Sequence, residues 1–274
     1  MTMAPRRWRA WLTTRRKLFR ISRVVTRLVG PRHHRHRRRI EIDVTWACNL
    51  NCYNCNRSCE QAPTTERMTL EQIRRFVADS VVRDIRWERI RLLGGEPALH
   101  PELPEILDAL RAYRDVHSQG TRLEIATNGH GSRVRTVLAR VPPDVVVIDT
   151  AKRSPVQPDF KSFNVAPQDL PAYRRADFRN GCWIIEKCGF GLGPYGFYPC
   201  AVAAGIDRVA GLDAGRKTLP SDADDMADLL DRFCRLCGHF KQERERTIDG
   251  PQASRSWDAL YRAYRERRPT LTRY

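Results

Sequence analysis

Apolar residues between positions 40 and 149 follow two alternating patterns. Between short apolar runs, apolar residues recur every three or four positions, which predicts amphipathic helices. Thr69 and Gln72 are placed to form a capping box at the start of the first helix. Strands that alternate with helices indicate parallel βα units and an α/β fold. The runs themselves predict four β-strands, at residues 40–44, 90–93, 123–126 and 145–148.

The pattern weakens after Asp149. Residues 163–166 and 183–185 are candidate fifth and sixth strands, and the Gly-, Pro- and aromatic-rich segment 189–200 predicts a structured loop or hairpin. A helix is expected over 222–233, with Ser221 as its N-cap. A last helix is expected over 254–267, with a buried face made of Trp257, Leu260, Tyr261 and Tyr264.

The first 39 residues differ from the rest of the chain. They hold fourteen Arg and Lys and no acidic residue, so the remaining 235 residues carry only about +3 of the net charge of +17. Gly30-Pro31 is expected to end an amphipathic basic helix and to start a solvated linker over 32–39. The helix is predicted over 8–29 from the helical spacing of Trp8, Trp11, Leu12, Leu18, Val25 and Val29.

This basic arm, residues 1–39, leaves several partners open. It is suited to peripheral contact with an anionic membrane surface or with an acidic or phosphorylated partner, or it is a disordered cationic tail. Nucleic acid is disfavoured, because the body is nearly neutral and shows no recognisable nucleic-acid module. The sequence lacks both an apolar run of transmembrane length and a continuous secretory signal, so we expect a cytoplasmic protein, with a peripheral membrane contact left open.

Nine cysteines fall into two groups. The first is Cys48, Cys52, Cys55 and Cys59; the second is Cys182, Cys188, Cys200, Cys234 and Cys237. Clustered cysteines in a reducing compartment indicate metal or redox chemistry. A disulfide-rich secreted fold is the competing interpretation, and it is disfavoured because residues 60–181 contain no cysteine.

The first group directly follows the first predicted strand. Thiolates at Cys48, Cys52 and Cys55 can hold one iron–sulfur cubane and leave its fourth iron without a protein ligand. If Cys59 supplied a fourth ligand, a closed zinc site would be the alternative.

Together with Gly94-Gly95-Glu96-Pro97 at the end of the second strand, this spacing resembles the radical S-adenosylmethionine (radical SAM) superfamily over about residues 40–200. The resemblance implies a [4Fe–4S] cluster on Cys48, Cys52 and Cys55, with S-adenosylmethionine bound at the open iron. It also implies that Gly94, Gly95 and Glu96 lie beside the methionyl ammonium. Asn54 departs from the family pattern, which usually has an aromatic residue there, facing the adenine. Further cofactor- or substrate-binding candidates lie at predicted strand ends: Thr127, Asn128, Asp149, Lys152 and Asn164.

The second group resembles the single-cluster auxiliary domains of the SPASM/Twitch type, in which a hairpin ends in Tyr-Pro-Cys and a Cys-x-x-Cys pair follows. The resemblance implies a second [4Fe–4S] cluster, held by Cys188, Cys200, Cys234 and Cys237. Cys182 is the alternate first ligand, because it gives the more usual separation from Cys200. A zinc ribbon built from these cysteines is the other interpretation.

We therefore predict a partial (β/α)6-type TIM barrel with a small cysteine-rich auxiliary-cluster extension. The predicted parts are the arm at 1–39, the radical SAM core at 40–180 and the extension at 181–274. The resemblance implies reductive cleavage of S-adenosylmethionine to a 5′-deoxyadenosyl radical, with flavodoxin or ferredoxin as reductant, and hydrogen abstraction from a substrate. We expect an oxidoreductase acting on a small molecule (a sugar, a cyclitol or a lipid-linked compound) by oxidation or rearrangement. A maturase of a ribosomally made peptide is the alternative, and a non-catalytic zinc or iron–sulfur module is a more distant one.

Overall fold

The computed structural model describes residues 5–152, 154, 162–242 and 250–274, with side chains from Leu12 onward. Four parallel strands lie side by side in the order of the chain, and they confirm the four predicted strands. The α/β class is therefore confirmed. The strands are β1 (Arg39–Thr45), β2 (Arg89–Gly94), β3 (Arg122–Thr127) and β4 (Val146–Asp149).

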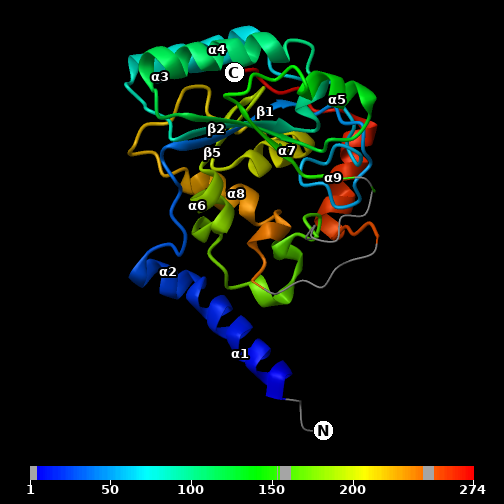
Figure 1. Ribbon diagram of the computed structural model, residues 1–274. Coiled ribbons are helices and arrows are strands. Elements are labelled where there is room, and N and C mark those ends of the chain that lie inside the picture. The colour runs from blue at the N-terminus through cyan, green and yellow to red at the C-terminus, as the bar shows by residue number, and fades with distance from the viewer. Residues whose placement is uncertain (1–4, 153, 155–161, 243–249) are drawn as a thin grey trace.

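Helices connect these strands as the apolar pattern predicts. They are α3 (Leu70–Val82), α4 (Leu103–His117) and α5 (Ser132–Leu138). The capping box at the start of α3 is confirmed, because Thr69 and Gln72 exchange hydrogen bonds between side chain and backbone. Helices α3 and α4 cover one face of the sheet (Figure 1), where Ile42 and Phe76 belong to the main apolar core.

The sheet gains two strands from the C-terminal part of the chain. The predicted hairpin at 189–200 is confirmed as β5 (Phe190–Gly193) and β6 (Gly196–Tyr198). Strand β5 pairs in parallel with β1, so the full strand order is β4-β3-β2-β1-β5-β6. The C-terminal part thus shares one sheet with the first four strands.

The fifth and sixth strands predicted at 163–166 and 183–185 are wrong. Residues 163–166 form turns, and residues 183–185 begin the helix α6 (Trp183–Cys188). Ile184 and Ile185 are buried on α6. A run of three apolar residues fits a buried helix as well as a strand, so this pattern could not separate the two.

The remaining helices are α7 (Ala201–Ala210), α8 (Ala227–Cys234) and α9 (Arg255–Glu266). Helix α9 confirms the prediction for 254–267, with Trp257, Tyr261 and Tyr264 buried. The prediction that α8 starts after Ser221 is wrong. The backbone carbonyls of Asp224 and Asp225 accept hydrogen bonds from arginines of the N-terminal segment, which holds this stretch outside the helix. Short 3₁₀ helices are Pro97–Leu99, Pro167–Asp169, Pro171–Tyr173, Phe178–Asn180 and Gly238–Phe240.

The single helix predicted over 8–29 is instead two helices, α1 (Pro5–Arg20) and α2 (Arg23–Val29), of which α1 projects away from the body (Figure 1). The break lies at Ile21, which is fully buried, and at Ser22, which caps α2 and forms a β-bridge with Ala176. Gly30 ends α2 as predicted. The side chains of Trp8 and Trp11 lie outside the described residues.

The solvated linker predicted over 32–39 is also wrong. Arg35 is only 9 % exposed and donates to the carbonyls of Asp224 and Asp225, while the Arg32 amide donates to Asn180. Because these polar groups of the body accept hydrogen bonds from the linker, the basic run packs on the C-terminal part of the chain.

The predicted division of the chain into three parts, with boundaries after residues 39 and 180, stays a prediction. Within the described ranges, no helix is both long and apolar enough to cross a membrane.

Candidate functional site

The first cysteine group lies in the loop that follows β1. The Cys59 thiol is hydrogen-bonded to Cys48 and Cys55, so these three sulfurs lie together. The contact with Cys59 lowers the pKa of the Cys55 thiol to about 6, and it also lowers the pKa of Cys48. Burial raises the pKa of Cys52 to about 11. All nine cysteines of the chain are described and none forms a disulfide, which disfavours the disulfide-rich alternative.

Gly94 and Gly95 let this loop pass close to the end of β2. A side chain at Gly94 would collide with the carbonyl of Thr45, and one at Gly95 with the carbonyl of Ala47. The Gly95 amide donates to Thr45 (2.8 Å) and the Glu96 amide to Ala47 (2.9 Å). The glycine pair therefore fixes the start of the cysteine loop, and its approach to a ligand stays a prediction.

Glu96 joins the end of β2 to the end of β3. Its buried carboxylate accepts hydrogen bonds from the Thr127 hydroxyl (2.8 Å), the Asn128 amide (2.8 Å) and the Ala98 amide (3.1 Å). Burial raises the pKa of Glu96, and these donors favour the ionised form. The carboxylate thus sets the position of Asn128.

Asn128 in turn contacts the cysteine loop. Its side-chain amide lies 3.8 Å from the Cys48 sulfur and donates to Asn49 Oδ1 at 2.8 Å. The Asn49 side-chain amide in turn donates to the carbonyl of His130 (2.7 Å), in the turn that follows β3. Three residues that the sequence predicted, Cys48, Glu96 and Asn128, are therefore connected at the C-terminal edge of the sheet.

Asn128 and Asp149 line one cavity of about 500 Å³ at this edge. Gly129 has φ +65°, and a side chain there would collide with the Asp149 carboxylate, so the turn after β3 needs glycine at this position. The nearby Lys152 has a positive charge that lowers the pKa of Cys52, Cys55 and Glu96. Two of the candidates at predicted strand ends, Asn128 and Asp149, thus line one cavity, and a third, Lys152, places its charge near the first cysteine group.

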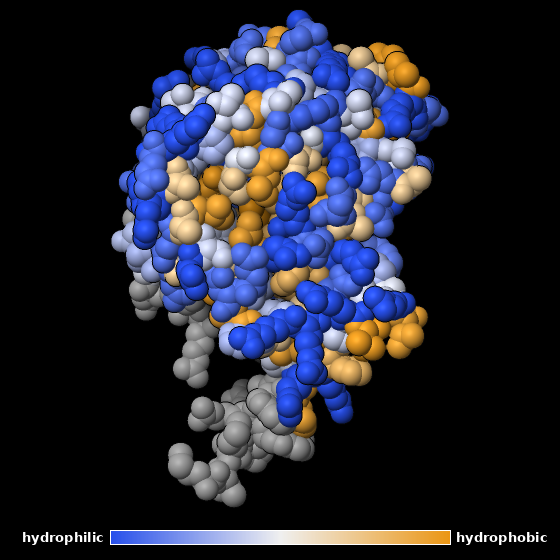
Figure 2. Space-filling view, turned by 180° about the vertical axis from the view of Figure 1, so that it is seen from behind, coloured by the Kyte–Doolittle hydropathy of each residue, from blue (hydrophilic) through white to orange (hydrophobic). Residues whose placement is uncertain are grey.

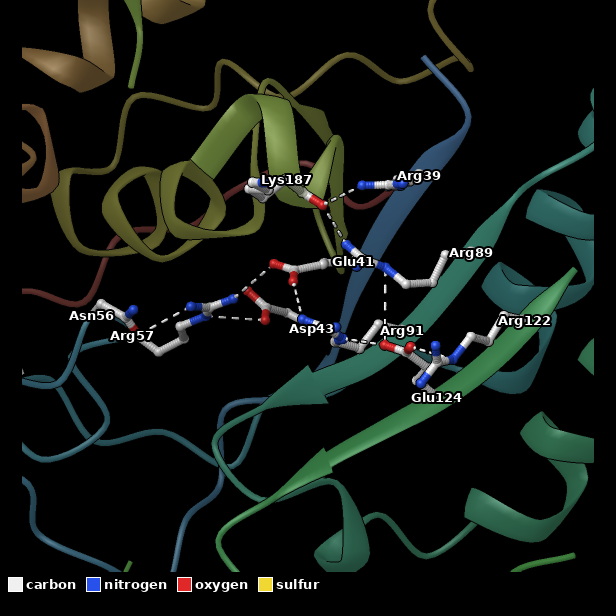
Figure 3. Close-up of polar contacts among 10 residues, drawn as sticks. All are labelled: Arg39, Glu41, Asp43, Asn56, Arg57, Arg89, Arg91, Arg122, Glu124 and Lys187. Atoms are coloured by element: carbon white, nitrogen blue, oxygen red, sulfur yellow. Dashed lines mark hydrogen bonds and ion pairs between the residues drawn. The ribbon is translucent and has the colours of Figure 1, made fainter. Parts of the chain in front are cut away.

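The sheet face opposite α3 and α4 carries a network of charges that the sequence analysis missed (Figure 3). Register places Glu41, Arg91 and Glu124 in one row across β1, β2 and β3. Arg91 bridges the two carboxylates, at 3.1 Å from Glu41 and 2.6 Å from Glu124. Alternating positions of a strand face opposite sides of a sheet, so the acidic residues at 41 and 124 could have indicated a polar face.

Arg57 connects this network to the cysteine loop. Its Nε donates to the Asp43 carboxylate at 3.3 Å, and its guanidinium lies 3.9 Å from Glu41 (Figure 3). Burial raises the pKa of Asp43 to about 6, although the Arg57 cation opposes the shift. The polar face of the sheet and the first cysteine group therefore meet at Arg57, two residues after Cys55.

In the second group, Cys182 rather than Cys188 lies with the other cysteines. Burial raises the pKa of Cys200 to about 12, and the Cys182 thiol is the next largest cause. The same pair of causes raises the pKa of Cys234 and Cys237. Cys188 instead contacts Glu41, since burial and that carboxylate raise its pKa to about 12.

The helix α6 gives the physical reason. Cys182 is its N-cap and Cys188 its last residue, so the two are separated by about 9 Å along the axis. Residues 183–185 were expected to form a strand, and Cys188 was expected to be the first ligand. The structure instead places the alternate, Cys182, with the other three cysteines, and its role as a ligand stays a prediction. As the side chains stand, no three His, Cys, Asp or Glu residues in the described ranges already have metal-site geometry.

Two predicted residues hold the C-terminal segment in place. Asn54, which occupies the family's aromatic position, exchanges hydrogen bonds with Gly250 and Gln252. Asn164 is buried and accepts from the Tyr261 hydroxyl at 3.0 Å, which also contacts Ser58 of the cysteine loop. Both therefore have a structural role that spacing along the chain did not indicate.

Known proteins resemble the part of the chain that holds the first cysteine group and Glu96. Residues 42–149 match the family described as the Radical SAM superfamily. The probable GTP 3′,8-cyclase of Methanococcus aeolicus is 31 % identical over 97 residues, which is 35 % of this chain and 31 % of that protein. The GTP 3′,8-cyclase of Acidothermus cellulolyticus is 35 % identical over 98 residues, which is 34 % of this chain and 25 % of that protein. The chain thus matches less than a third of the length of these relatives.

Among solved structures, "Crystal structure of BtrN in complex with AdoMet and 2-DOIA" aligns with a TM-score of 0.42 at 14 % identity. The alignment covers 79 % of this chain and 98 % of that chain. A similarity at this level is too low to support an inference about the site. The family match covers β1 to β4, the first cysteine group and Glu96. This chain therefore carries a radical SAM domain over residues 42–149, the domain of a superfamily of enzymes.

Proposed function

We propose that this chain cleaves S-adenosylmethionine reductively and abstracts a hydrogen from a substrate, using a [4Fe–4S] cluster on Cys48, Cys52 and Cys55. The observation that carries the proposal is the connection of Cys48 to Asn128 and Glu96 within the matched domain. The donor set fits such a cluster, because three cysteines on one loop leave one iron open for the cofactor.

A [4Fe–4S] cluster held by Cys48, Cys52 and Cys55 would supply the electron for reductive cleavage of the S–C5′ bond of S-adenosylmethionine, to methionine and a 5′-deoxyadenosyl radical. The chain's own residues bind and orient. We propose that Asn128, which contacts the cysteine loop, and Asp149 hydrogen-bond the cofactor at the C-terminal ends of β3 and β4, where both line the 500 Å³ cavity. Lys152 places a positive charge beside the thiolates, which favours their ionised, metal-binding form. Glu96 holds Asn128 in place through the Asn128 amide.

The second cysteine group is proposed to hold an auxiliary [4Fe–4S] cluster of the SPASM/Twitch type, on Cys182, Cys200, Cys234 and Cys237. The mutual electrostatic effects of these four thiols support this set over the one with Cys188. Four thiolates also suit zinc, so metal analysis is needed to separate the two.

The substrate is proposed to be a polar small molecule, which the reaction oxidises or rearranges. The charged row Glu41, Arg91 and Glu124 on the sheet face opposite α3 and α4 supports this class, because a polar ligand can hydrogen-bond to such a surface whereas an apolar ligand would only remove it from water. The two relatives named above are GTP 3′,8-cyclases by name, but each aligns with this chain over fewer than 100 residues. The alignments therefore support the presence of a radical SAM domain and do not support GTP as the substrate. A peptide substrate is the second candidate.

Two further partners are proposed. A flavodoxin or ferredoxin is the proposed reductant, and the arm is proposed to contact an anionic surface.

Iron and sulfide analysis of anaerobically reconstituted protein tests the assignment of both sites. We expect about eight irons per chain, and about four after Cys48, Cys52 and Cys55 are all replaced by Ala. Replacing Cys59 by Ser serves as the control, because the proposal gives that thiol no iron. Stoichiometric zinc with no charge-transfer absorption would contradict the proposal.

A further inference from the structure

A cationic cavity of about 550 Å³ lies beside α2 and is lined by residues of α2, of the following segment up to Arg37 and of the start of α8. We call it the α2 pocket. It is within the volume range of small-ligand sites. Among its described lining residues the only carboxylate is Asp225. The basic lining residues are Arg27, Arg35, Arg37, Arg179, His33 and His34.

Arg35 is the cation in this pocket that most needs an anion. It is 9 % exposed, its terminal nitrogens donate only to backbone carbonyls, and its Nε has no hydrogen-bond partner. Burial, together with the neighbouring Arg37 cation, lowers the pKa of Arg35 to about 10. A buried charge is costly unless an opposite charge compensates it.

The nearby carboxylates have other partners. Asp224 pairs with Arg216 at 3.1 Å, and the Asp225 carboxylate accepts from the Ala227 amide at 2.9 Å. Of the lining arginines, Arg179 is paired, with Asp177 at 2.6 Å. The α2 pocket therefore keeps an excess of positive charge that an anionic ligand can neutralise.

Helix α2 also exposes apolar side chains to solvent. Val24 is 70 % exposed and Leu28 is 77 % exposed, and their i, i+4 spacing puts them on one side of α2. Val29 of α2 is exposed as well (62 %), and so is Phe19 (71 %) near the end of α1. Figure 2 shows an apolar patch here, beside strongly hydrophilic groups. We call the three residues of α2, Val24, Leu28 and Val29, the α2 patch.

The α2 patch is on an anchored element and not on a loose tail. The Arg23 amide donates to Arg175 (2.9 Å), and the Asn180 side chain donates to the Thr26 hydroxyl (2.7 Å). Ile21 directly before α2 is fully buried. The body therefore holds the patch and the pocket in a fixed relation to each other.

We propose that α2 docks on an anionic phospholipid bilayer, with the α2 patch in the interfacial region and a headgroup phosphate in the α2 pocket. Interfacial helices combine apolar side chains with arginines in this way, and a nucleic acid or acidic protein would not need the exposed Val24 and Leu28. The inference deepens the proposed contact of the arm with an anionic surface and does not depend on the radical chemistry.

Co-sedimentation of the full chain with phosphatidylcholine vesicles, with and without phosphatidylglycerol, tests the proposal. We expect binding to the anionic vesicles and release by added salt. Val24→Ser with Leu28→Ser should weaken binding more than about tenfold, and Arg27→Gln about fivefold. Val82→Ser with Val116→Ser is the matched control, because these valines are 85 % and 88 % exposed on α3 and α4. The control variant should bind like the wild type.

Equal binding of the wild type and the Val24/Leu28 variant would overturn the proposal. Binding of heparin or inorganic phosphate without binding of vesicles would also overturn it and leave a soluble anion site. Each variant is also assayed in solution for 5′-deoxyadenosine formation, which should equal that of the wild type. Absence of 5′-deoxyadenosine from the wild type, together with normal vesicle binding, would instead count against the proposed function alone.

Discussion

Cys182 and Cys188 show how the position of one thiol depends on the element that carries it. Both are in the second cysteine group, and they lie at opposite ends of α6. The Cys182 thiol contributes to the raised pKa of Cys200, Cys234 and Cys237, whereas the Cys188 thiol contacts the Glu41 carboxylate. At the scale of single residues, the helix α6 therefore separates the two thiols and places Cys182, the residue with the more usual separation from Cys200, with the other three cysteines.

Single substitutions test this choice. Cys182→Ser should lose about four of the eight irons, because it removes one ligand of the auxiliary site. Cys188→Ser should keep all eight and serves as the matched control. Anaerobic iron and sulfide analysis of the two purified variants gives the answer. Iron loss in Cys188→Ser alone would return the assignment to the sequence-based preference.

Asp43 gives the free energy of unfolding a pH dependence. The pKa of Asp43 is raised to about 6 in the folded protein, with burial as the main cause, so the folded state binds its proton more tightly than the unfolded state. Its contribution to stability is then greatest below the unfolded pKa of about 4 and is lost as the pH rises through about 6. Relative to Asp43→Asn, which cannot titrate, the wild type should lose up to about 3 kcal/mol between pH 4 and pH 7. Denaturant unfolding of both proteins across this range checks it, and parallel pH profiles would contradict it.

At the scale of elements, the alternation of strands and helices up to β4 was predictable from the sequence. Each strand there is an uninterrupted short run, and each helix is long enough to repeat its apolar spacing of three or four residues. The later elements were not predictable, because their apolar runs are short and their positions depend on distant partners. Strand β5 pairs with β1, about 150 residues earlier in the chain. Helix α8 starts later than predicted because Arg35 and Arg37 donate hydrogen bonds to the backbone carbonyls just before it.

The connection between α1 and α2 is the element-scale feature with the clearest energetic consequence. Ile21 packs in a second apolar cluster together with Phe178, Phe240 and Cys234. Ile21→Ala should lower the free energy of unfolding by about 2–5 kcal/mol, because it leaves a cavity in that cluster. It should also reduce iron at the second cysteine group. Val24→Ala, on the exposed face of α2, should change stability by less than about 0.5 kcal/mol. Denaturant unfolding measures both, and equal stabilities would contradict the packing.

At the scale of the whole molecule, the basic arm is two different segments. Residues 21–38 pack on the C-terminal part, through Ile21, Arg32 and Arg35, whereas most of α1 extends away from it (Figure 1). The sequence pattern could not show this, since a run of arginines and histidines looks solvated unless its carbonyl partners are known. The cysteine spacing and the Gly-Gly-Glu motif did indicate two segments that the structure connects through Asn128, because both motifs are local features of the chain.

Two truncations separate these segments. Removing residues 1–16 should leave the unfolding midpoint and the iron content unchanged, because α1 projects away from the body and the buried Ile21 lies after the cut (Figure 1). Removing residues 1–38 should lower the midpoint and deplete the auxiliary iron, since it uncovers the cluster around Phe178 and Phe240. Thermal unfolding with iron analysis checks both, and two equally stable truncations would show that the arm is dispensable.

The central claim is that the loop at Cys48, Cys52 and Cys55 supports cleavage of S-adenosylmethionine. Its most direct test is the chromatographic measurement of 5′-deoxyadenosine, after anaerobically reconstituted protein is mixed with a chemical reductant and S-adenosylmethionine. The wild type and the control Cys188→Ser should form the product, and Cys52→Ala should not. No product from wild-type protein with its iron fully loaded, or undiminished product from Cys52→Ala, would contradict the account.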